Sequence, residues 1–518
     1  MTLATARMIA LMYIGVDLGT TSTKVAAFGA SGELLALASH GYPLEVPEPG
    51  AAEQDPGMIV QATLKGLGEV VAKVGAQRVR ALCFGAAMHS IVPLDASGVP
   101  LTRALTWADG RASRWAERIR RIEGGARVAA RTGTPPYAMS PLAKLRWLRE
   151  EYPEVTAQAA RFISIKEYVL HALFGIWAVD HSTASASGLF GLLARDWDDE
   201  ALNLARVKRE QLSPLVPTTW RLPPLRPEIA RELGLDPQTP AIIGANDGAL
   251  SNLGSGAVTP GIAAISLGTS GAMRVTVDSP YVEPGGRTFC YALTEDRWVV
   301  GGPTNNGAIV LRWLRDNFAP TDAAYARAKG EDPYQALLSL AARAPAGSDG
   351  LLFLPYLLGE RAPLWSSGAR GAYIGVSIEH RREHFLRAAL EGVALNLALV
   401  SGLLAGRVPT PRELRASGGF ARSPLWRQIL CDVLDRPLGI PQTVETAALG
   451  ATLLARVALG ELPGLEAAGA LVSVQDQHSP DPAASAVYAD LLPIFARLAE
   501  GLLDDSRALV ALQRQEED

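Results

Sequence analysis

A run of hydroxyl side chains follows an acid and a glycine in the segment "YIGVDLGTTSTKVAAF", which spans Tyr13 to Phe28. The apolar residues on either side predict two strands, and Gly19 allows a tight turn between them. Hydroxyl and backbone N–H groups in such a turn suit a phosphate, because its oxygens need several donors at once. Asp17 fits beside a phosphate only with a metal ion between the two anions. A plain hairpin with polar turn residues also explains this segment when it is taken alone.

The same pattern occurs a second time in "GIAAISLGTSGAMRV", Gly261 to Val275. Gly268 and Thr269 match Gly19 and Thr20 of the first turn, whereas Ser266 stands where the first copy has its acid. Similar hairpins that open two halves of a chain indicate two related α/β domains that face each other across a cleft. Two phosphate-binding turns with one acid suit a nucleotide polyphosphate with one metal ion. Chance similarity of two short Gly-Thr turns is the alternative.

Asp247 lies between a predicted strand and a predicted helix in "AIIGANDGALSNLG". Asp is a favoured N-cap residue, so a structural role at the start of the helix is one interpretation. Open α/β sheets bind ligands beyond the carboxyl ends of their strands, which also puts Asp247 where a substrate is expected. A carboxylate in that place can accept the proton of an attacking hydroxyl, as the catalytic acid does in kinases generally.

Two further segments carry side chains that suit a polyol. His89 in "GAAMHSIVPLD" follows a predicted strand, and is either a satisfied loop histidine or a donor to a sugar hydroxyl. The segment "TWADGR" groups Trp107, Asp109 and Arg111 within five residues. An indole against a carbon skeleton, with an acid and a guanidinium on hydroxyls, is ordinary polyol recognition. A surface ion pair beside a packed Trp is the alternative.

The segment "RASGGFARSPLWRQILCDVL" predicts a strand end, a double glycine and a helix. Gly418 and Gly419 would let the backbone approach a flat ligand, and a helix N-terminus adds N–H donors. The chain contains no G-x-x-x-x-G-K-[ST] and no dinucleotide fingerprint G-x-G-x-x-G, so neither of those nucleotide sites is expected.

Composition limits the class of protein. The chain has 518 residues, of which 48% are hydrophobic and 20% charged, so a folded protein of two or more domains is expected. A net charge of −4 without a basic block gives no support for nucleic-acid binding. Three distant cysteines indicate a reducing compartment, and the apolar stretch from Met8 is too short for a membrane span. We therefore expect a cytoplasmic protein without a membrane partner, whose true start is Met1, Met8 or Met12.

Apolar spacing predicts the elements that position these residues. Buried strands are expected at 80–88 and 240–245, and helices at 140–151 and 383–405. The domain junction is expected near Gly254 to Gly261, just before the second hairpin. The tail from Ala484 to Gln513 predicts an amphipathic helix, followed by an acidic end.

Taken in order along the chain, these motifs resemble the FGGY carbohydrate kinases. Two longer stretches, "MSPLAKLRWLREE" and "GAYIGVSIEHRREHFLRAALE", are also similar to signature regions of that family. The resemblance implies an α/β fold of two actin-like, ribonuclease-H-like ATPase domains around a central cleft. It implies an N-terminal domain at 12–256, a C-terminal domain at 257–480 and a helical tail at 481–518.

Within the family, "MHS", "SIKEYVLHALFG", "STASASGLFGLLARDWDDEAL" and "GGPTNNGAIVLRWLRD" are most similar to gluconokinases. Xylulokinases also carry a Met-His pair but typically follow it with Gly, where this chain has Ser90. The resemblance implies ATP-dependent phosphorylation of the 6-hydroxyl of D-gluconate, with Mg²⁺ as cofactor. A kinase for xylulose or a related pentulose is the alternative, and a non-catalytic actin-like ATPase or sugar-binding regulator is the alternative of another class.

The resemblance also implies roles for individual residues. Asp247 matches the catalytic base, and Asp17 matches the acid that holds Mg²⁺, largely through water and together with Asp247. The expected ATP contacts are Gly19, Thr20, Thr21, Ser22, Lys24, Gly268, Thr269, Ser270, Gly418, Gly419 and Ser423. The expected sugar contacts are Met88, His89, Trp107, Asp109, Arg111, Lys166, Asn305 and Asn306, in addition to Asp247.

A gluconate carboxylate needs a cation or several strong donors in the sugar site. Four residues are candidates for this role, and the sequence does not choose among Lys166, Arg111, His89 and Arg361. The expected partners are the small-molecule sugar acid or sugar and ATP, and the family also suggests a homodimer.

Overall fold

Both hydroxyl-rich turns join antiparallel strands in the computed structural model, which describes residues 11–515. β1 (Met12–Leu18) pairs with β2 (Ser22–Phe28), and β14 (Ile262–Leu267) pairs with β15 (Gly271–Val277). The two predicted hairpins are therefore confirmed. The possible start residues Met1 and Met8 lie outside the described residues, as does the acidic end of the chain.

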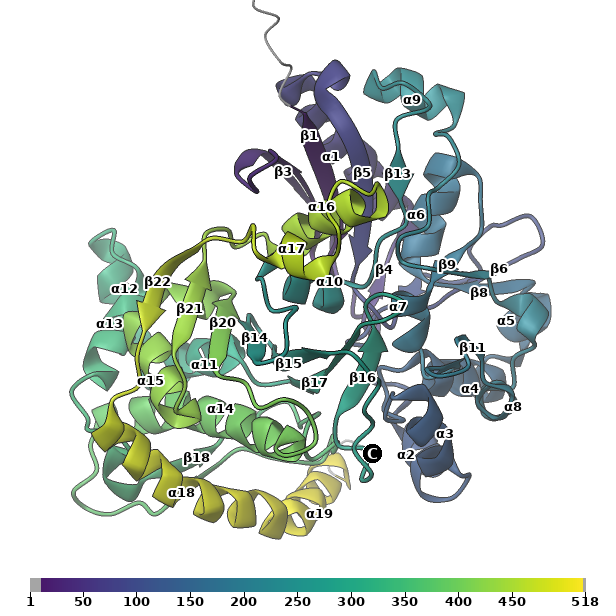
Figure 1. Ribbon diagram of the computed structural model, residues 1–518. Helices are drawn as coiled ribbons and strands as arrows, with labels where there is room; N and C mark the ends of the chain where they lie inside the picture. The colour runs from purple at the N-terminus through teal and green to yellow at the C-terminus, as the bar shows by residue number, and fades with distance from the viewer. Residues whose placement is uncertain (1–10, 516–518) are drawn as a thin grey trace, which may run out of the picture.

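Each hairpin forms the centre of a larger sheet (Figure 1). The first sheet has the order β13-β5-β1-β2-β3, and its other strands are β3 (Leu34–Gly41), β5 (Val79–Ala86) and β13 (Ala241–Ile242). The second has the order β16-β17-β15-β14-β20-β21-β22. Its other strands are β16 (Phe289–Ala292), β17 (Trp298–Thr304), β20 (Glu413–Ser417), β21 (Leu438–Pro441) and β22 (Val474–His478).

The two sheets repeat one topology. In the first, β3, β2 and β1 are antiparallel neighbours, and β5 and β13 then continue parallel to β1. In the second, β17, β15 and β14 are antiparallel, and β20 and β21 continue parallel to β14. β16 and β22 extend the second sheet at its two edges. The internal repeat predicted from the two Gly-Thr turns is thus a repeat of whole sheets.

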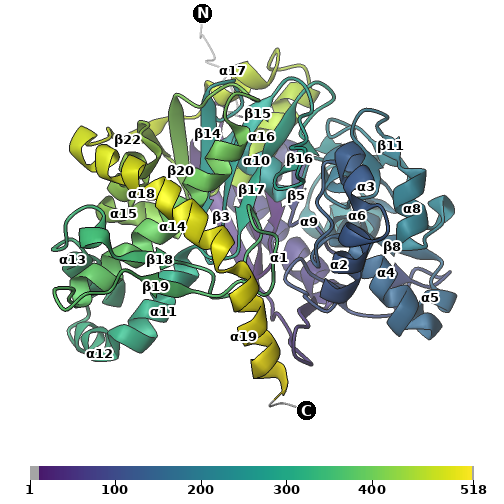
Figure 2. The same cartoon turned by 90° about the horizontal axis from the view of Figure 1, so that it is seen from below.

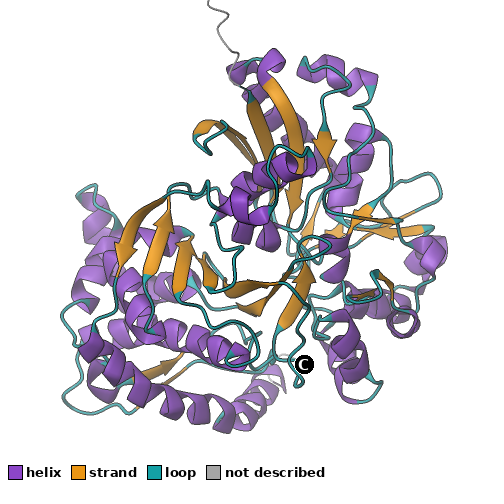
Figure 3. Ribbon diagram, in the orientation of Figure 1, coloured by secondary structure: helices purple, strands orange, loops and turns teal. Residues whose placement is uncertain are grey.

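Helices cover both faces of the first sheet (Figure 3). On one face α1 (Pro56–Val74) and α6 (Ile165–Phe174) pack on Ile14, Val16 and Phe84. The other face packs on α10 (Asp247–Gly254) and α16 (Thr446–Ala458), with α17 (Leu465–Gly469) beside them. Since α16 comes from the second half of the chain, the two halves share a core.

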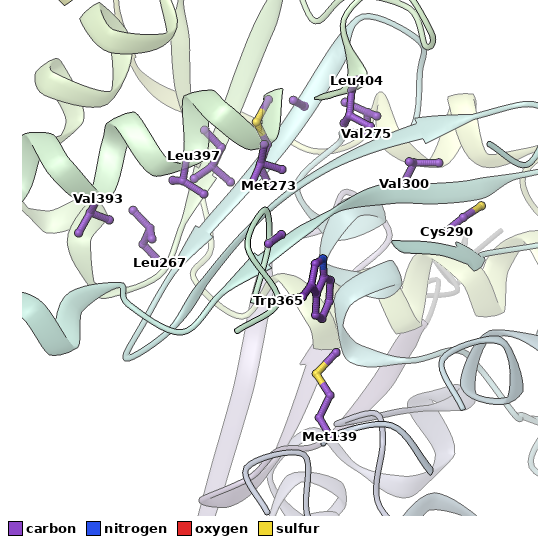
Figure 4. Close-up of a cluster of buried hydrophobic side chains, with 14 of the residues drawn as sticks. Met139, Leu267, Met273, Val275, Cys290, Val300, Trp365, Val393, Leu397 and Leu404 are labelled. Carbon is purple, nitrogen blue, oxygen red and sulfur yellow. The ribbon is translucent and has the colours of Figure 1, made fainter. Parts of the chain in front are cut away.

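The second sheet packs on the long helix α14 (Arg382–Leu404). Figure 4 shows Val393 and Leu397 of this helix beside Leu267 and Met273 of the hairpin strands. α14 confirms the helix predicted at 383–405. Among the described residues it is the one helix long and apolar enough to cross a membrane, and 78% of its most apolar window is buried inside the protein. The remaining helices of this half are α11 (Ala308–Phe318), α12 (Pro320–Ala328), α13 (Pro333–Ala341) and α15 (Pro424–Leu434).

A third region, drawn in blue in Figure 1, is inserted between β5 and β13 of the first sheet. It contains α4 (Pro141–Glu151), where Ser140 accepts a hydrogen bond from the Ala143 N–H and Pro141 occupies the first helical position. The other helices of the region are α2 (Ser113–Arg121), α3 (Gly125–Thr132), α5 (Pro153–Gln158), α7 (His181–Ser185), α8 (Asp199–Ala205) and α9 (Pro227–Leu233). Short strands connect them, at β6 (Val92–Leu94), β7 (Ala104–Leu105), β8 (Arg161–Ile163), β9 (Val179–Asp180), β10 (Phe190–Gly191), β11 (Asp196–Trp197) and β12 (Leu215–Val216). β4 (Glu53–Gln54), which precedes β5 in the chain, pairs with β7.

The C-terminal tail forms two helices, where the sequence predicts one. α18 (Pro482–Gly501) and α19 (Leu503–Gln515) are separated at Leu502, directly after a glycine, the poorest helix former other than proline. α18 packs against α15 and α14, near the small sheet of β18 (Leu352–Leu354) and β19 (Ala372–Ile374). Figure 2 shows the two helices running diagonally across the second half toward the boundary with the first.

The two halves meet most closely where α10 crosses α16. A Cβ atom on Gly254 would lie 1.8 Å from the Thr446 carbonyl oxygen, and one on Gly450 would lie 1.9 Å from the Leu250 carbonyl oxygen. Gly15 of β1 has the same relation to Ala448, at 2.1 Å. At each of these positions a backbone occupies the place of a side chain, so only glycine fits.

We expect Gly450→Ala to destabilise the protein strongly, because the added methyl group meets helix backbone that cannot rotate away. Overpacking of this kind costs about 1–3 kcal/mol or more. Gly402→Ala is the matched control, since a Cβ at this position near the end of α14 would meet nothing within 4 Å. Thermal denaturation followed by circular dichroism measures both. Equal melting temperatures for the two variants would contradict the role given to the crossing.

Candidate active site

The cavity between the two hairpins is the candidate active site. It encloses about 310 Å³ and is lined by Thr20 of the first turn and by Gly268 to Gly271 of the second. Asp247 at the start of α10 also faces it. Nine of the candidate site residues from the sequence meet at this cavity, namely Thr20, Met88, His89, Trp107, Asp247, Gly268, Thr269, Ser270 and Arg361.

Asp247 is the first residue of α10 and leaves the capping role to its neighbour. The Asn246 side chain accepts a hydrogen bond from the Ala249 N–H, so the interpretation of Asp247 as N-cap is wrong. Burial raises the pKa of Asp247, and the positive charge of Arg274 opposes that rise. One Asp247 oxygen accepts the Gly248 N–H at 2.7 Å. The carboxylate therefore stands at the cavity wall beside a cation, in reach of a ligand.

Asp17 lies near the end of β1, opposite Lys24 of β2. Its Oδ1 atom is buried and has no hydrogen-bond partner among the residues that the structure describes. Burial raises the pKa of Asp17 to about 7, and the negative charge of Asp247 adds to the rise. A divalent cation between the two carboxylates would remove both penalties. Within residues 11–515 no cluster of three His, Cys, Asp or Glu side chains could hold a metal alone, which fits an ion held partly through water.

His89 faces the cavity as a neutral imidazole. Its Nδ1 lies 2.7 Å from the Ala186 carbonyl oxygen, which can only accept, so Nδ1 carries the proton and Nε2 is left as an acceptor. Burial and the charge of Lys144 lower the pKa of His89 to about 3. The sequence prediction of a donor to a sugar hydroxyl is therefore revised to an acceptor, and His89 is no cation for a carboxylate.

Trp107 joins the first hydroxyl-rich turn to the wall of the cavity. Its indole Nε1–H donates to the Thr20 hydroxyl at 2.7 Å. The Arg361 guanidinium lies over its ring, 5.1 Å from the centroid. The ring is thus fixed on one side by the turn and covered on the other by a cation.

Lys144 holds the loops of His89 and Trp107 together, a role that sequence reasoning missed. Its fully buried ammonium donates to the carbonyl oxygen of His89 at 2.8 Å and also to that of Thr106. Burial lowers the pKa of this lysine to about 7. The residue sits in the middle of the quoted "MSPLAKLRWLREE" stretch, where a lysine among apolar positions of a helix was the available signal.

Asp109 and Arg111 bind each other instead of facing the cavity. Arg111 also pairs with Glu48 and Glu53, and its guanidinium lies 4.6 Å from the centre of the Trp147 ring. Asp109 is buried and accepts the Ala52 N–H at 3.1 Å. Contrary to the expectation of sugar contacts, these side chains fix the loop that carries Trp107.

Lys166 is likewise occupied inside the protein. Its ammonium donates to Asp180 at 2.8 Å and to the Ala245 carbonyl oxygen at 3.2 Å, and only 1% of the residue is exposed. Ala245 lies two residues before Asp247. The expected sugar contact is therefore a buried ion pair that supports the segment leading into Asp247.

Asn305 and Asn306 also turn toward protein partners. Asn305 donates to the Leu358 carbonyl oxygen, and Asn306 donates to the Gly359 carbonyl oxygen at 2.7 Å and to Glu360 at 3.1 Å. Neither lines the cavity in this structure. Their contacts hold the loop that ends in Arg361, and Arg361 is the residue of this loop that reaches the cavity.

The remaining expected ATP contacts lie around the two turns. Gly19 and Gly268 close the turns through hydrogen bonds to the carbonyl oxygens of Ser22 and Ser270, at 3.0 and 2.9 Å. Thr21 follows Thr20 in the first turn. Lys24 forms an ion pair of 2.8 Å with Glu445, the residue before α16.

The double glycine lies beside the second turn. Gly418 follows β20 with a φ angle of +101°, and a Cβ there would lie 2.4 Å from the Leu267 carbonyl oxygen. A Cβ on Gly419 would meet nothing within 4 Å, so its face is open. Ser423 is the N-cap of α15 and accepts the Trp426 N–H. This arrangement leaves room for a flat group next to the phosphate turn.

Among the residues of the cavity wall that were not predicted, two carry polar groups suited to a ligand. Arg274 and Tyr291 come from β15 and β16, the strands on either side of β17. An arginine in the apolar strand "GAMRV" was the available sequence signal, while Tyr291 in "FCYAL" gave none.

Comparison with known proteins identifies the family of the chain. The N-terminal domain model of the FGGY family of carbohydrate kinases matches residues 12–254, and its C-terminal domain model matches residues 263–459. A gluconokinase of Bacillus subtilis is 42% identical over 97% of this chain and 98% of its own.

Two solved structures from Lactobacillus acidophilus share the fold, which confirms the predicted α/β architecture. One is a gluconate kinase with a TM-score of 0.90, and the other is a ligand-bound xylulose kinase with a TM-score of 0.89. Both are 34% identical to this chain and cover 95% of it, as well as 98% of their own length. The chain therefore belongs to the FGGY family of carbohydrate kinases, as its sequence motifs predicted.

Proposed function

We propose that the protein transfers the γ-phosphoryl group of ATP to the 6-hydroxyl of D-gluconate and forms 6-phospho-D-gluconate. The observation that carries this proposal is that Asp247 and residues of both turns line one cavity, with Asp17 close enough to Asp247 for their charges to interact. The near full-length similarity to a gluconokinase favours gluconate as the acceptor.

In the proposed reaction Asp247 accepts the proton of the sugar hydroxyl as the oxygen attacks the γ-phosphorus. The bond between that phosphorus and the bridging oxygen breaks, and ADP leaves. Arg274 beside Asp247 helps to keep the carboxylate ionised, which a base requires. Thr20, Thr269 and the backbone N–H groups of both turns bind the phosphate oxygens.

Asp17 and Asp247 would hold Mg²⁺, which the buried and unpartnered Oδ1 of Asp17 fits. When bound, the ion neutralises charge on the phosphate groups. Asp17 keeps its carboxylate fixed by burial at the end of β1, with Lys24 opposite. For the adenosine part of ATP we propose the open face at Gly419, between the second turn and α15.

A kinase for xylulose or a related pentulose is the second candidate. The structure of a xylulose kinase is as similar to this chain as that of a gluconate kinase, at 34% identity each. The full-length similarity of 42% to a gluconokinase decides for gluconate. A non-catalytic regulator is disfavoured, since both Asp17 and Asp247 are present and close enough to interact.

The substrate proposal is tested by ADP release with Mg-ATP and gluconate, xylulose, ribulose, glycerol or fuculose. We expect kcat/KM to be highest for gluconate, because the cavity wall carries two arginines. Glycerol, with neither a carboxylate nor six carbons, serves as the weak-substrate control. A preference for a pentulose would overturn the gluconate assignment and leave the kinase assignment standing.

Asp247→Asn should fold and bind ATP but lose most of its turnover. Removal of a general base typically costs 10²–10⁴-fold in rate, so we expect kcat to fall within that range. Asp490→Asn, on the exposed side of α18, is the control for an Asp to Asn change away from the cavity. Steady-state measurements with saturating gluconate and ATP give kcat, and single-turnover measurements give the rate of the chemical step. Near-normal turnover in Asp247→Asn would rule out this residue as the base.

Asp17→Asn should weaken metal binding without loosening the fold. An amide fills the same space, and no charge then has to be buried beside Asp247. We expect the Mg²⁺ concentration at half-maximal activity to rise at least tenfold, with a melting temperature equal to or above that of the wild type. Mn²⁺ binding in the presence of a non-hydrolysable ATP analogue, followed by electron paramagnetic resonance, gives a readout independent of activity. Unchanged Mn²⁺ affinity would show that Asp17 does not hold the metal.

A further inference from the structure

A half-buried arginine, a buried arginine and a buried tyrosine line the same cavity. Arg274 comes from β15, Tyr291 from β16, and Arg361 from the loop held by Asn305 and Asn306. Tyr291 is 2% exposed and Arg361 is 8% exposed. Burying a guanidinium is costly unless its N–H groups find acceptors and its charge finds an anion.

Arg361 has donors that the protein leaves unused. One terminal nitrogen donates to the Thr304 carbonyl oxygen at 2.8 Å, and the other lies 3.8 Å from the Met139 sulfur, a weak acceptor. Its Nε is buried and has no partner within residues 11–515. The adjacent Glu360 accepts from Thr304 and from backbone N–H groups, but no hydrogen bond joins it to this guanidinium in the described structure.

Arg274 is also incompletely paired. It donates to the Ser266 hydroxyl at 3.0 Å, and its guanidinium lies over Gly248, where a Cβ would come within 3.1 Å of its Nε. Its nearest acid is Asp247, and no hydrogen bond joins the two side chains in the described structure. Because Asp247 has to stay free to accept a proton, the other donors of Arg274 remain for a ligand.

Tyr291 lines the same cavity as these two cations. Its hydroxyl is buried without a hydrogen-bond partner in the described part of the chain. Burial raises the pKa of Tyr291 well above its usual value, and the charges of Arg361 and Arg274 oppose the rise, so both guanidinium groups are near the hydroxyl. The donors of Tyr291, Arg274 and Arg361 therefore belong to the wall of one cavity.

We propose that Arg274, Tyr291 and Arg361 form a subsite for the carboxylate of the sugar acid. A carboxylate offers two oxygens and about four lone-pair sites, enough to accept from the hydroxyl and from both guanidinium groups. A neutral sugar in the same place would leave the unused N–H donors of both guanidinium groups without a charged acceptor. This inference rests on the proposed function and names the residues that select an acid over a neutral sugar.

The other cations near the cavity are already committed to protein partners. Arg111 is paired with three acids and Lys166 with Asp180. Lys144 is used on two backbone carbonyl oxygens, and His89 is neutral. Of the four candidates that the sequence offered, only Arg361 keeps a charge and free donors at the cavity, and the structure adds Arg274.

The test compares D-gluconate with D-glucitol, the neutral polyol that has a hydroxymethyl group in place of the carboxylate. Isothermal titration of the full chain gives the Kd of each, for the wild type and for Arg361→Gln, Arg274→Gln and Tyr291→Phe. We expect the Kd for gluconate to rise about 10²-fold in either glutamine variant and about tenfold in Tyr291→Phe. The Kd for glucitol should change less than threefold.

Two conservative variants keep the test independent of folding. Arg361→Lys and Arg274→Lys retain the charge but not the forked geometry, so their gluconate affinities should lie between those of the wild type and the glutamine variants. Melting temperatures identify any variant that has lost its fold, and its lysine counterpart then supplies the comparison.

Equal weakening of gluconate and glucitol would overturn the subsite, since it would indicate general damage to the cavity. Unchanged gluconate affinity in both glutamine variants would overturn it as well. Failure of the proposed function is seen separately, as a wild type that prefers a pentulose in the ADP-release assay. In that event a selective loss of gluconate binding in the variants would still support an anion subsite.

Discussion

The architecture depends on the contact between α10 and α16, where helix backbones touch without side chains between them. Gly254 and Gly450 permit this approach, and Gly15 lets α16 settle on β1 in the same way. α10 begins with Asp247, and α16 follows directly after Glu445, the partner of Lys24. A single close crossing thus sets where the proposed base stands relative to the first phosphate turn. If the two helices lay further apart, the distance between Asp247 in the first half and Glu445 in the second would increase as well.

Several buried charged side chains hold the loops around the cavity in place. Lys144 joins the loops of His89 and Trp107, and Lys166 supports the segment before Asp247. Glu360 collects N–H and hydroxyl donors around the loop of Arg361. Burying each of these charges is costly, and hydrogen bonds to backbone groups offset part of that cost. The same hydrogen bonds hold the backbone of the loops in place. The loops that these buried charges fix carry residues that line the cavity.

The fold and part of the site could be predicted from the sequence. The two turns and Asp247 are encoded locally, because a glycine, hydroxyl groups and an acid beside apolar strands leave few other structures. Lys166, Asn305 and Asn306 were expected at the sugar because of their polarity and position along the chain. Whether such a side chain points into a cavity or toward a buried partner is decided by tertiary packing, which a single sequence does not display.

Tyr291 and Arg274 of the cavity wall were missed for the same reason, because tertiary packing decides where their side chains lie. Tyr291 is unremarkable in a strand, where aromatic residues are common, and only the pairing of β16 with β17 brings it to the cavity. The Arg274 guanidinium fits at the cavity wall because its neighbour Gly248 has no side chain. Pairwise relations of this kind, between distant residues, are what the structure supplies.

The ion pair of Lys24 and Glu445 affects which anions can bind at Lys24. At 2.8 Å the ammonium already has an anionic partner, and the carboxylate side of the pair is largely shielded from water. Any phosphate that approaches Lys24 has to compete with Glu445 for it. A triphosphate offers many oxygens and several negative charges for that exchange, whereas inorganic phosphate or chloride offers few. If Lys24 contacts ATP as proposed, the ion pair with Glu445 would favour a polyanion over a small anion at this position.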